Sequence, residues 1–262
     1  PAMQLTTMQD IAGVRAILDA IEDVERLVNE YKAETRFEHE LIDEKDYISF
    51  PRSEDGYRSH HLIYRYKNSR NPLYNGLRVE MQLRTRLQHV WATAVETMGT
   101  FLGQALKSRQ GDQEWIDFFA IVSSAFAYRE GRPLVPRFEA FTEEQTFHTV
   151  AIAEQRIGAL DRMTAFSTAV KQIPSSSTQA YTYHLIVLDS LNKIVTIKAY
   201  GRDDYEKALH DFSCEEERAV NGEKIEPVLV SAGRIDTLKR AYPNFFLDIR
   251  EFIHLVREIV SK

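Results

Sequence analysis

The stretch LRVEMQLRT, residues 77–85, alternates apolar and polar side chains along its whole length. Successive side chains of a β-strand point to opposite faces. Val79, Met81 and Leu83 therefore share one face, which the pattern assigns to a hydrophobic core. The other face carries a carboxylate and an amide among guanidinium groups: Arg78, Glu80, Gln82 and Arg84. A solvated strand face more often carries Thr, Lys and Ser, so this charged face indicates a functional site.

Short strands and one helix account for the residues before this stretch. Apolar segments of strand length lie at residues 11–18, 37–42, 59–66 and 78–85. Residues 20–34 instead have the three- and four-residue apolar spacing of an amphipathic helix. We therefore expect a mixed β-sheet with flanking helices. The loop FPRSEDG, residues 50–56, is rich in Pro, Ser, Asp and Gly and is a candidate binding element.

The apolar period becomes helical after Thr85. Helical patterns occupy residues 87–107, 115–128 and 143–172, and Gly158 interrupts the last of them. The segment PSSST, which begins at Pro174, breaks the helical pattern and predicts a domain junction.

A small α+β unit follows this junction. Its predicted strands lie at residues 181–189, 193–200 and 227–232, and its predicted helices at residues 203–220, 235–241 and 246–260. The fold class is therefore α+β. We expect two domains, residues 1–173, which include the long connecting helix 143–172, and residues 174–262.

Composition excludes several classes of protein. No apolar run approaches the roughly 20 residues that a membrane span needs. The single cysteine, Cys214, excludes an internal disulfide and a cysteine-held zinc, and it fits a cytoplasmic location. A net charge of −6 argues against a protein that coats nucleic acid, so we expect no DNA partner and only local RNA contacts. The sequence begins PAMQLTTMQD without an initiating Met, and we expect it to start within a longer protein.

Two further polar clusters have both a functional and a plain structural interpretation. Asp10 and Arg15 bracket an apolar IAGV segment, where an Asp is often only a turn residue. The segment KDYISFPRSEDGYRSHH, residues 45–61, carries cations that suit phosphate groups and a tyrosine, Tyr57, that offers a stacking face for a base. Its structural interpretation is a solvated hairpin loop.

Five motifs resemble one family. DIAGVR, KDYI, GYRSHH, VEMQLRT and HVWA match, in order and spacing, the motifs of the synthetase domain of RelA/SpoT-type pyrophosphokinases over residues 8–91. The resemblance implies a nucleotidyltransferase-like sheet and the transfer of the β,γ-pyrophosphate of ATP to a ribose 3′-hydroxyl with magnesium. The charged strand face is then explained, because a carboxylate can bind the cation or take the hydroxyl proton while guanidinium groups neutralise phosphate oxygens.

The resemblance also implies roles for individual residues. Asp10 and Glu80 would hold Mg²⁺, with Glu80 also the general base and Arg84 a further catalytic residue. The donor phosphates would be bound by Arg15, Lys45, Arg52, Arg58 and Ser59. The acceptor would be bound by Tyr57, which stacks on its base, and by His61, Gln82 and His89. For His89, a helix-capping or buried histidine is an equal alternative.

The sequence departs from the family pattern at two places. No R-x-K-D segment, which grips ATP in the family, precedes Asp10 in the printed sequence. If the whole protein lacks it, a catalytically inactive nucleotide- or RNA-binding regulator is the expectation. The A-E-x-x-H pattern that commonly follows HVWA is replaced by ATAVETMG, residues 92–99.

The altered helix resembles the toxic small alarmone synthetases. That resemblance implies pyrophosphorylation of the 3′-terminal adenosine of tRNA, which blocks translation; the alternative is synthesis of (p)ppGpp or (p)ppApp from free nucleotides. A tRNA acceptor needs phosphate contacts outside the catalytic cleft. Candidates, each also explicable as an ordinary surface cation, are Lys67, Arg70, Lys107, Arg109, Arg129, Arg132 and Arg137.

The C-terminal segment resembles the fused antitoxin domain of CapRel-type proteins, a zinc-finger-like fold without metal ligands. In those proteins a Y-x-x-Y segment covers the ATP site until a phage protein, such as a capsid protein, releases it. The resemblance implies an anti-phage toxin inhibited by its own C-terminal domain, with Tyr242 and Phe245 as the covering aromatics. The alternative for YPNFF, residues 242–246, is the start of a helix with aromatic core residues.

Overall fold

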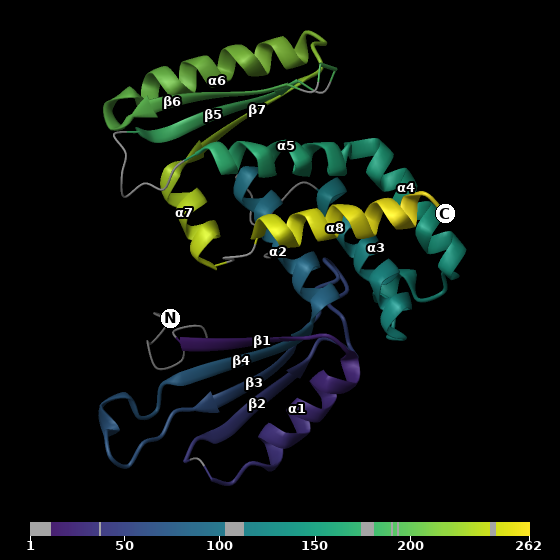
Figure 1. Ribbon diagram of the computed structural model, residues 1–262, viewed down its shortest axis with the longest axis vertical. Helices are drawn as coiled ribbons and strands as arrows, with labels where there is room; N and C mark the ends of the chain where they lie inside the picture. The colour runs from purple at the N-terminus through teal and green to yellow at the C-terminus, as the bar shows by residue number, and fades with distance from the viewer. Residues whose placement is uncertain are drawn as a thin grey trace. The chain divides into compact units, whose positions relative to one another are not determined.

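The structure is a computed structural model that describes residues 12–36, 38–102, 113–173, 181–189, 191–192, 194–241 and 245–262 (Figure 1). The chain forms two compact units. The first unit comprises the residues up to His89 together with Ala120–Thr146, and the second comprises Val90–Phe119 together with Phe147–Lys262. The helices that contain residues 89 and 120 therefore contribute to both units.

The first unit is built on a four-stranded mixed sheet. Its strands are β1 (Ala12–Leu18), β2 (Glu40–Asp46), β3 (His60–Arg65) and β4 (Arg78–Thr85). The order across the sheet is β1-β4-β3-β2, with β1 parallel to β4 and the other neighbours antiparallel. The prediction of a mixed sheet is confirmed, and the LRVEMQLRT strand, β4, is one of its two inner strands.

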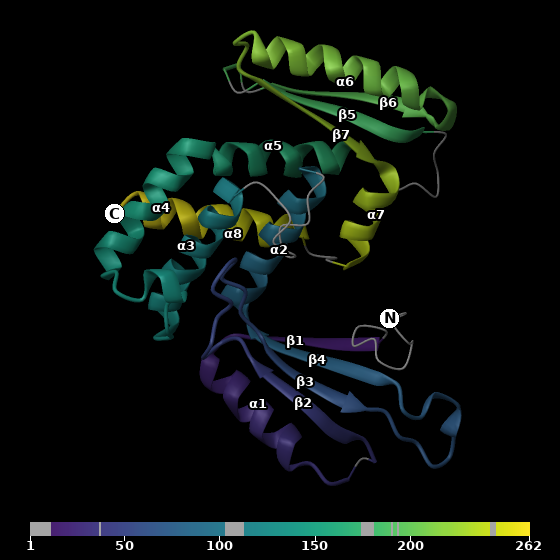
Figure 2. The ribbon, with the colours of Figure 1, turned by 180° about the vertical axis from the view of Figure 1, so that it is seen from behind.

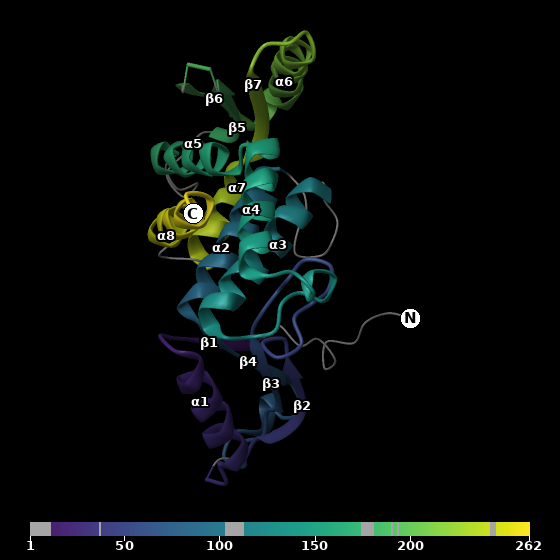
Figure 3. The same cartoon turned by 90° about the vertical axis from the view of Figure 1, so that its right-hand side faces the viewer.

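One face of this sheet is covered by α1 (Ile21–Ala33), as Figures 1 and 3 show. Ile21, Val24 and Val28 of α1 are buried against Leu62 of β3 and Leu83 of β4. Their three- and four-residue spacing places them on one stripe of the helix, which matches the apolar side of the strands. The core therefore lies on the α1 face, and the charged side chains of β4 lie on the other.

Strand β2 differs from its prediction. It runs over Glu40–Asp46 rather than residues 37–42, and its pairing with β3 shifts register between Leu41 and Asp43. The shift breaks the apolar alternation that the prediction relied on, and the charged second half of the strand is tolerated because β2 is an edge strand. The KDY motif consequently begins on a strand.

The helices after β4 largely follow the predicted pattern. They are α2 (Arg86–Phe101), α3 (Gln113–Glu130), α4 (Glu143–Ile157) and α5 (Ala159–Gln172), with short 3-10 turns at Pro72–Tyr74 and Pro136–Phe138. The long helix predicted at residues 143–172 is two helices, because Gly158 takes a left-handed conformation with φ of 59°. The predicted helical residues beyond position 102 lie partly outside the described residues.

The second unit contains a three-stranded antiparallel sheet in the order β6-β5-β7. Its elements are β5 (Tyr181–Asp189), β6 (Ile194–Gly201), the 3-10 turn Arg202–Asp204, α6 (Tyr205–Val220), β7 (Ile225–Ser231), α7 (Ala232–Ala241) and α8 (Phe245–Val260). Helix α6 covers one face of this sheet, as Figure 2 shows, around a core of Leu185, Tyr200 and Ala208. The α+β class is confirmed. The likeness of this part to a zinc finger stays a prediction.

The two compact units divide the chain differently from the two predicted domains. Residues 90–119 and 147–173 group with the C-terminal elements rather than with the first sheet. Within the second unit, α5 pairs with β7 through an ion pair between Arg162 and Glu226. The functional division at residue 173 remains a prediction. No described helix combines the length and the apolar character that crossing a membrane requires.

Candidate functional site

Four predicted site residues form one row across all four strands of the first sheet. Lys45 of β2 pairs with His61 of β3, His61 with Gln82 of β4, and Gln82 with Arg15 of β1. Directly paired residues of adjacent strands project on the same face of a sheet. Glu80 projects from β4 on that same face, one step along the strand. Residues from four separate motifs therefore converge on the face opposite α1.

Glu80 is held by two neighbours in this row. His61 Nδ1 lies 2.8 Å from Glu80 Oε1, and Gln82 Nε2 donates to Glu80 Oε2 at 2.7 Å. The hydrogen bond from His61, followed by that from Gln82 and the charge of Lys45, lowers the pKa of Glu80 despite its partial burial. Glu80 is therefore a carboxylate at neutral pH, able to accept a proton.

Only Glu80 of the two predicted magnesium ligands lies within the described residues. Mg²⁺ at nucleotide sites is usually bound by one or two carboxylates together with phosphate oxygens. Glu80 fits that requirement, because each of its oxygens accepts one hydrogen bond from the protein and retains a lone pair. Asp10 lies outside the described residues, so the pairing of Asp10 with Glu80 stays a prediction.

An aromatic group borders the row. Tyr57 Oη lies 2.9 Å from His61 Nε2, and the rings of Tyr47, Tyr57 and His61 pack edge to face. Tyr47 was not among the predicted site residues, although its place directly after Lys45 and Asp46 in the KDYI motif was the signal that could have identified it. Tyr57 is buried, so only a small part of it is open to a base.

Arg52 contacts protein groups in place of the predicted phosphate. Its guanidinium lies 4.8 Å from the centre of the Tyr57 ring and forms an ion pair with the buried Asp55. Asp55 Oδ1 also accepts a hydrogen bond from the Tyr57 backbone at 2.9 Å. The FPRSEDG loop is therefore a folded turn that presents Tyr57, which argues against the solvated-hairpin alternative.

Arg58 requires a correction. Its side chain is buried and donates to Ser123 Oγ at 2.9 Å, to the Ile48 carbonyl at 3.2 Å and to the Pro133 carbonyl at 2.7 Å. Burial lowers its pKa to about 10. The structure gives Arg58 a structural role in place of the predicted phosphate contact, because all three of its nitrogens are used inside the protein.

Three more predicted residues are buried. Ser59 Oγ donates to the Leu83 carbonyl at 3.2 Å, and Arg84 Nη2 lies 2.7 Å from His89 Nδ1. None of Ser59, Arg84 and His89 is exposed enough in this conformation to meet a nucleotide. For His89 the alternative of a buried histidine is the one observed. The roles of Ser59 and Arg84 at phosphates stay predictions.

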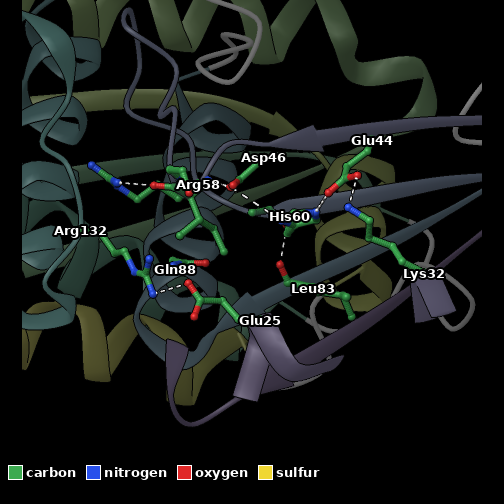
Figure 4. Close-up of polar contacts among 12 residues, drawn as sticks. Glu25, Lys32, Glu44, Asp46, Arg58, His60, Leu83, Gln88 and Arg132 are labelled. Atoms are coloured by element: carbon green, nitrogen blue, oxygen red, sulfur yellow. Dashed lines mark hydrogen bonds and ion pairs between the residues drawn. The ribbon is translucent and has the colours of Figure 1, made fainter. Parts of the chain in front are cut away.

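The α1 face carries a second polar network, around His60 (Figure 4). His60 Nε2 lies 2.9 Å from Glu44 Oε1, and Lys32 Nζ donates to Glu44 Oε2 at 2.6 Å. Arg132, a predicted RNA contact, is instead half-buried in an ion pair with Glu25 at 2.5 Å. This pairing gives Arg132 a contact within the protein, and its role toward RNA stays a prediction.

Of the remaining residues predicted to contact RNA or to cover the ATP site, some are exposed and the others lie outside the described part of the chain. Lys67, Arg70, Arg129 and Arg137 are exposed, and Arg137 donates to the Glu54 carbonyl at 3.3 Å. Lys107, Arg109 and Tyr242 lie outside the described residues. Phe245 begins α8, but its side chain also lies outside the description. Their predicted roles in RNA contact and autoinhibition therefore stay predictions.

The candidate site lies within a part of the chain that is similar to known proteins. Residues 2–99 match the family described as "Region found in RelA / SpoT proteins". The match contains the whole four-stranded sheet, α1 and every residue of the polar row. The match covers the segment over which the five motifs resemble RelA/SpoT proteins, and it spans well under half of the chain.

Two curated proteins of Bacillus subtilis (strain 168) are similar to the same part. GTP pyrophosphokinase YjbM is 36% identical over 93 residues, 36% of this chain and 43% of that protein. GTP pyrophosphokinase YwaC is 36% identical over 89 residues, 33% of this chain and 40% of that protein. The chain thus spans less than half the length of these relatives. Among solved structures, small alarmone synthetase 2 from Bacillus subtilis has a TM-score of 0.41 at 25% identity, over 49% of this chain and 67% of that one.

Proposed function

We propose that this protein is an ATP-dependent pyrophosphokinase that transfers the β,γ-pyrophosphate of ATP to a ribose 3′-hydroxyl. The observation that carries the proposal is Glu80, an ionised carboxylate that lies beside the polar row of Lys45, His61, Gln82 and Arg15. The row lies within the segment that matches RelA/SpoT proteins. Both curated relatives are named GTP pyrophosphokinases, which supports the same reaction class.

In the proposed reaction, Glu80, Lys45 and Arg15 have different roles. Glu80 accepts the proton of the 3′-hydroxyl, the ribose oxygen attacks the β-phosphorus of ATP, and the bond to the α-phosphate oxygen breaks, so that AMP leaves with the electron pair. Lys45 and Arg15, at the two ends of the row, supply positive charge for the phosphate oxygens. When bound, Mg²⁺ held by Asp10 and Glu80 would neutralise phosphate charge.

Two acceptors fit this reaction. A free purine nucleotide is supported by the names of the relatives, both of which are GTP pyrophosphokinases. The 3′ end of tRNA is the acceptor implied by the resemblance to toxic synthetases, which would need phosphate contacts outside the cleft. The first unit has exposed cations, Arg129 and Arg137 among them. The active-site residues act on a ribose hydroxyl in either case.

We further propose that the C-terminal residues restrain this activity until a phage protein, such as a capsid protein, binds them. This proposal rests on the resemblance of that segment to fused antitoxin domains and on the toxicity that pyrophosphorylated tRNA implies. The protein would then act in abortive defence in the cytoplasm, where its free and exposed Cys214 fits a reducing environment.

The acceptor is identified by incubating the full-length protein with ATP labelled at the γ-phosphate and, separately, GDP, GTP, ADP, ATP or deacylated tRNA. Label in tetra- or pentaphosphate nucleotides supports the free-nucleotide acceptor. Label in tRNA that is lost on removal of the terminal adenosine supports the tRNA acceptor. Each reaction is repeated with the candidate trigger protein, which should raise the rate if the C-terminal residues restrain catalysis.

A further inference from the structure

The His61 imidazole lies between Tyr57 and Glu80. Its Nδ1 is 2.8 Å from Glu80 Oε1, and its Nε2 is 2.9 Å from Tyr57 Oη. An ionised carboxylate can only accept hydrogen bonds, so Nδ1 must carry a proton. In the neutral ring Nε2 then has a lone pair, and the Tyr57 hydroxyl donates to it. These contacts select one tautomer of His61.

The second oxygen of Glu80 is fixed from the other side. Gln82 Nε2 donates to Glu80 Oε2 at 2.7 Å, and Gln82 Oε1 accepts from Arg15 Nε at 3.4 Å. One chain of hydrogen bonds therefore runs from Tyr57 through His61, Glu80 and Gln82 to Arg15, across β3, β4 and β1. The side chains of His61 and Glu80 are only 9% and 14% exposed, so water competes weakly for these contacts.

We propose that His61 is a positioning residue that joins Tyr57, the residue implied to stack on the acceptor base, to Glu80, the proposed general base, so that binding of the acceptor and orientation of the base are coupled. The proposal rests on the function proposed above. His61 itself transfers no proton and touches no reacting atom. Its Nδ1–H holds Oε1 of Glu80 in place, and the Tyr57 hydroxyl holds His61 in the tautomer that allows this.

The charges around Glu80 support a positioning role for His61. The hydrogen bond from His61 is the largest cause of the lowered pKa of Glu80, ahead of the bond from Gln82 and the charge of Lys45. Lys45 faces the row from β2, Arg15 faces it from β1, and Arg78 shares the face of Glu80 on β4. These cations remain when the His61 contact is removed, so a His61 variant changes one contact of Glu80 and leaves the surrounding charge in place.

The adjacent histidine provides a matched control. His60 is as buried as His61 and also contacts a glutamate, Glu44, at 2.9 Å. It projects to the opposite, α1 face of the sheet, as Figure 4 shows. A His60 variant thus removes an equivalent histidine–glutamate contact next to the site without touching the chain from Tyr57 to Arg15.

Two substitutions at His61 separate its two contacts. The side-chain nitrogen of His61→Asn lies near the position of Nδ1 and can still donate to Glu80, whereas that of His61→Gln reaches toward the position of Nε2. We expect His61→Gln to lower kcat by about 10–100-fold with the KM for ATP unchanged, the usual effect of losing an orienting partner. His61→Asn should retain a kcat close to the wild-type value, and His60→Gln should leave both kcat and KM unchanged.

A readout without turnover tests the same contacts. The ring ¹⁵N chemical shifts of His61 should report a proton on Nδ1, and Tyr57→Phe should shift the population toward the other tautomer. A wild-type ring protonated at Nε2 alone overturns the proposal, as do equal kcat values for His61→Asn and His61→Gln. If no acceptor is pyrophosphorylated, the proposed function fails, whereas the tautomer measurement still decides how His61 and Glu80 are joined.

Discussion

Gly56 lies directly against Ser123 of α3, whose Oγ donates to the Gly56 carbonyl at 2.6 Å. Gly56 has φ of 78°, and a Cβ atom added to it would lie 2.8 Å from Ser123 Cβ. Only glycine meets both conditions, because other residues rarely adopt positive φ and would collide with the helix. This contact holds the turn in place, so that the next residue, Tyr57, packs against His61.

Replacement of Gly56 by Ala should therefore destabilise the protein by more than the conformational cost alone. We expect a loss of about 2–4 kcal/mol, which combines about 1–3 kcal/mol for positive φ with the collision at Ser123. Chemical denaturation measures the change. Gly76→Ala is the control, since Gly76 has φ of 92° but nothing within 4 Å of an added Cβ. An equal loss of unfolding free energy at Gly56 and Gly76 would show that the close packing at Ser123 does not add to the cost.

Arg58 should contribute mainly to stability. Arg58→Leu leaves the buried Ser123 hydroxyl and Ile48 carbonyl without their donor, and each buried unsatisfied acceptor costs about 1–3 kcal/mol. The free energy of unfolding should fall by about 2–5 kcal/mol. The exposed pair of Arg65 with Glu40 is the comparison, and Arg65→Leu should cost at most about 1 kcal/mol. A stable Arg58→Leu protein that has lost only ATP affinity would restore the phosphate-binding role.

The network on the α1 face should make stability depend on pH. The hydrogen bond from Lys32, with a further one from His60, lowers the pKa of Glu44 below its ordinary value of 4.5. A carboxyl group with a depressed folded-state pKa stabilises the protein above its unfolded pKa, and this contribution disappears as the pH falls through the folded value. Denaturant midpoints should therefore decline below about pH 4.5, and Glu44→Gln should flatten that decline. A Glu44→Gln protein with an unchanged slope would exclude this cause.

Autoinhibition predicts a gain of toxicity on substitution of Tyr242. If this aromatic side chain helps to cover the ATP site, Tyr242→Ala should stop growth on expression without any trigger protein. The double variant Tyr242→Ala with Glu80→Gln should be harmless, which separates pyrophosphokinase toxicity from misfolding. Normal growth of cells that express a catalytically active Tyr242→Ala protein would refute the restraining role.

The sequence predicted the two faces of β4 because alternation with period two is a local property of a strand. It also predicted the mixed sheet and most of the helices. The row of Lys45, His61, Gln82 and Arg15 could not be derived in the same way, because it depends on the registers of three strand pairs and on the parallel alignment of β1 with β4. The register shift in β2 similarly hid the true extent of that strand.

The likeness to known motifs did not predict where the side chains of the motif residues lie. Arg58 and Arg84 occur in the expected motifs, yet their guanidinium groups contact Ser123 and His89, respectively. A cation in a motif can serve a phosphate or the protein interior, and only tertiary packing decides between them. The separation of His60 from His61, in contrast, was available from strand alternation.

The central claim is that Glu80 activates a ribose hydroxyl for attack on the β-phosphorus of ATP. The direct measurement follows the adenine nucleotide released when the full-length protein acts on ATP and its acceptor. We predict that AMP forms in step with an acceptor that gains both phosphates, and that Glu80→Gln slows this by about 10²–10⁴-fold while Glu44→Gln does not. Release of ADP, or transfer by Glu80→Gln at the wild-type rate, would contradict the account.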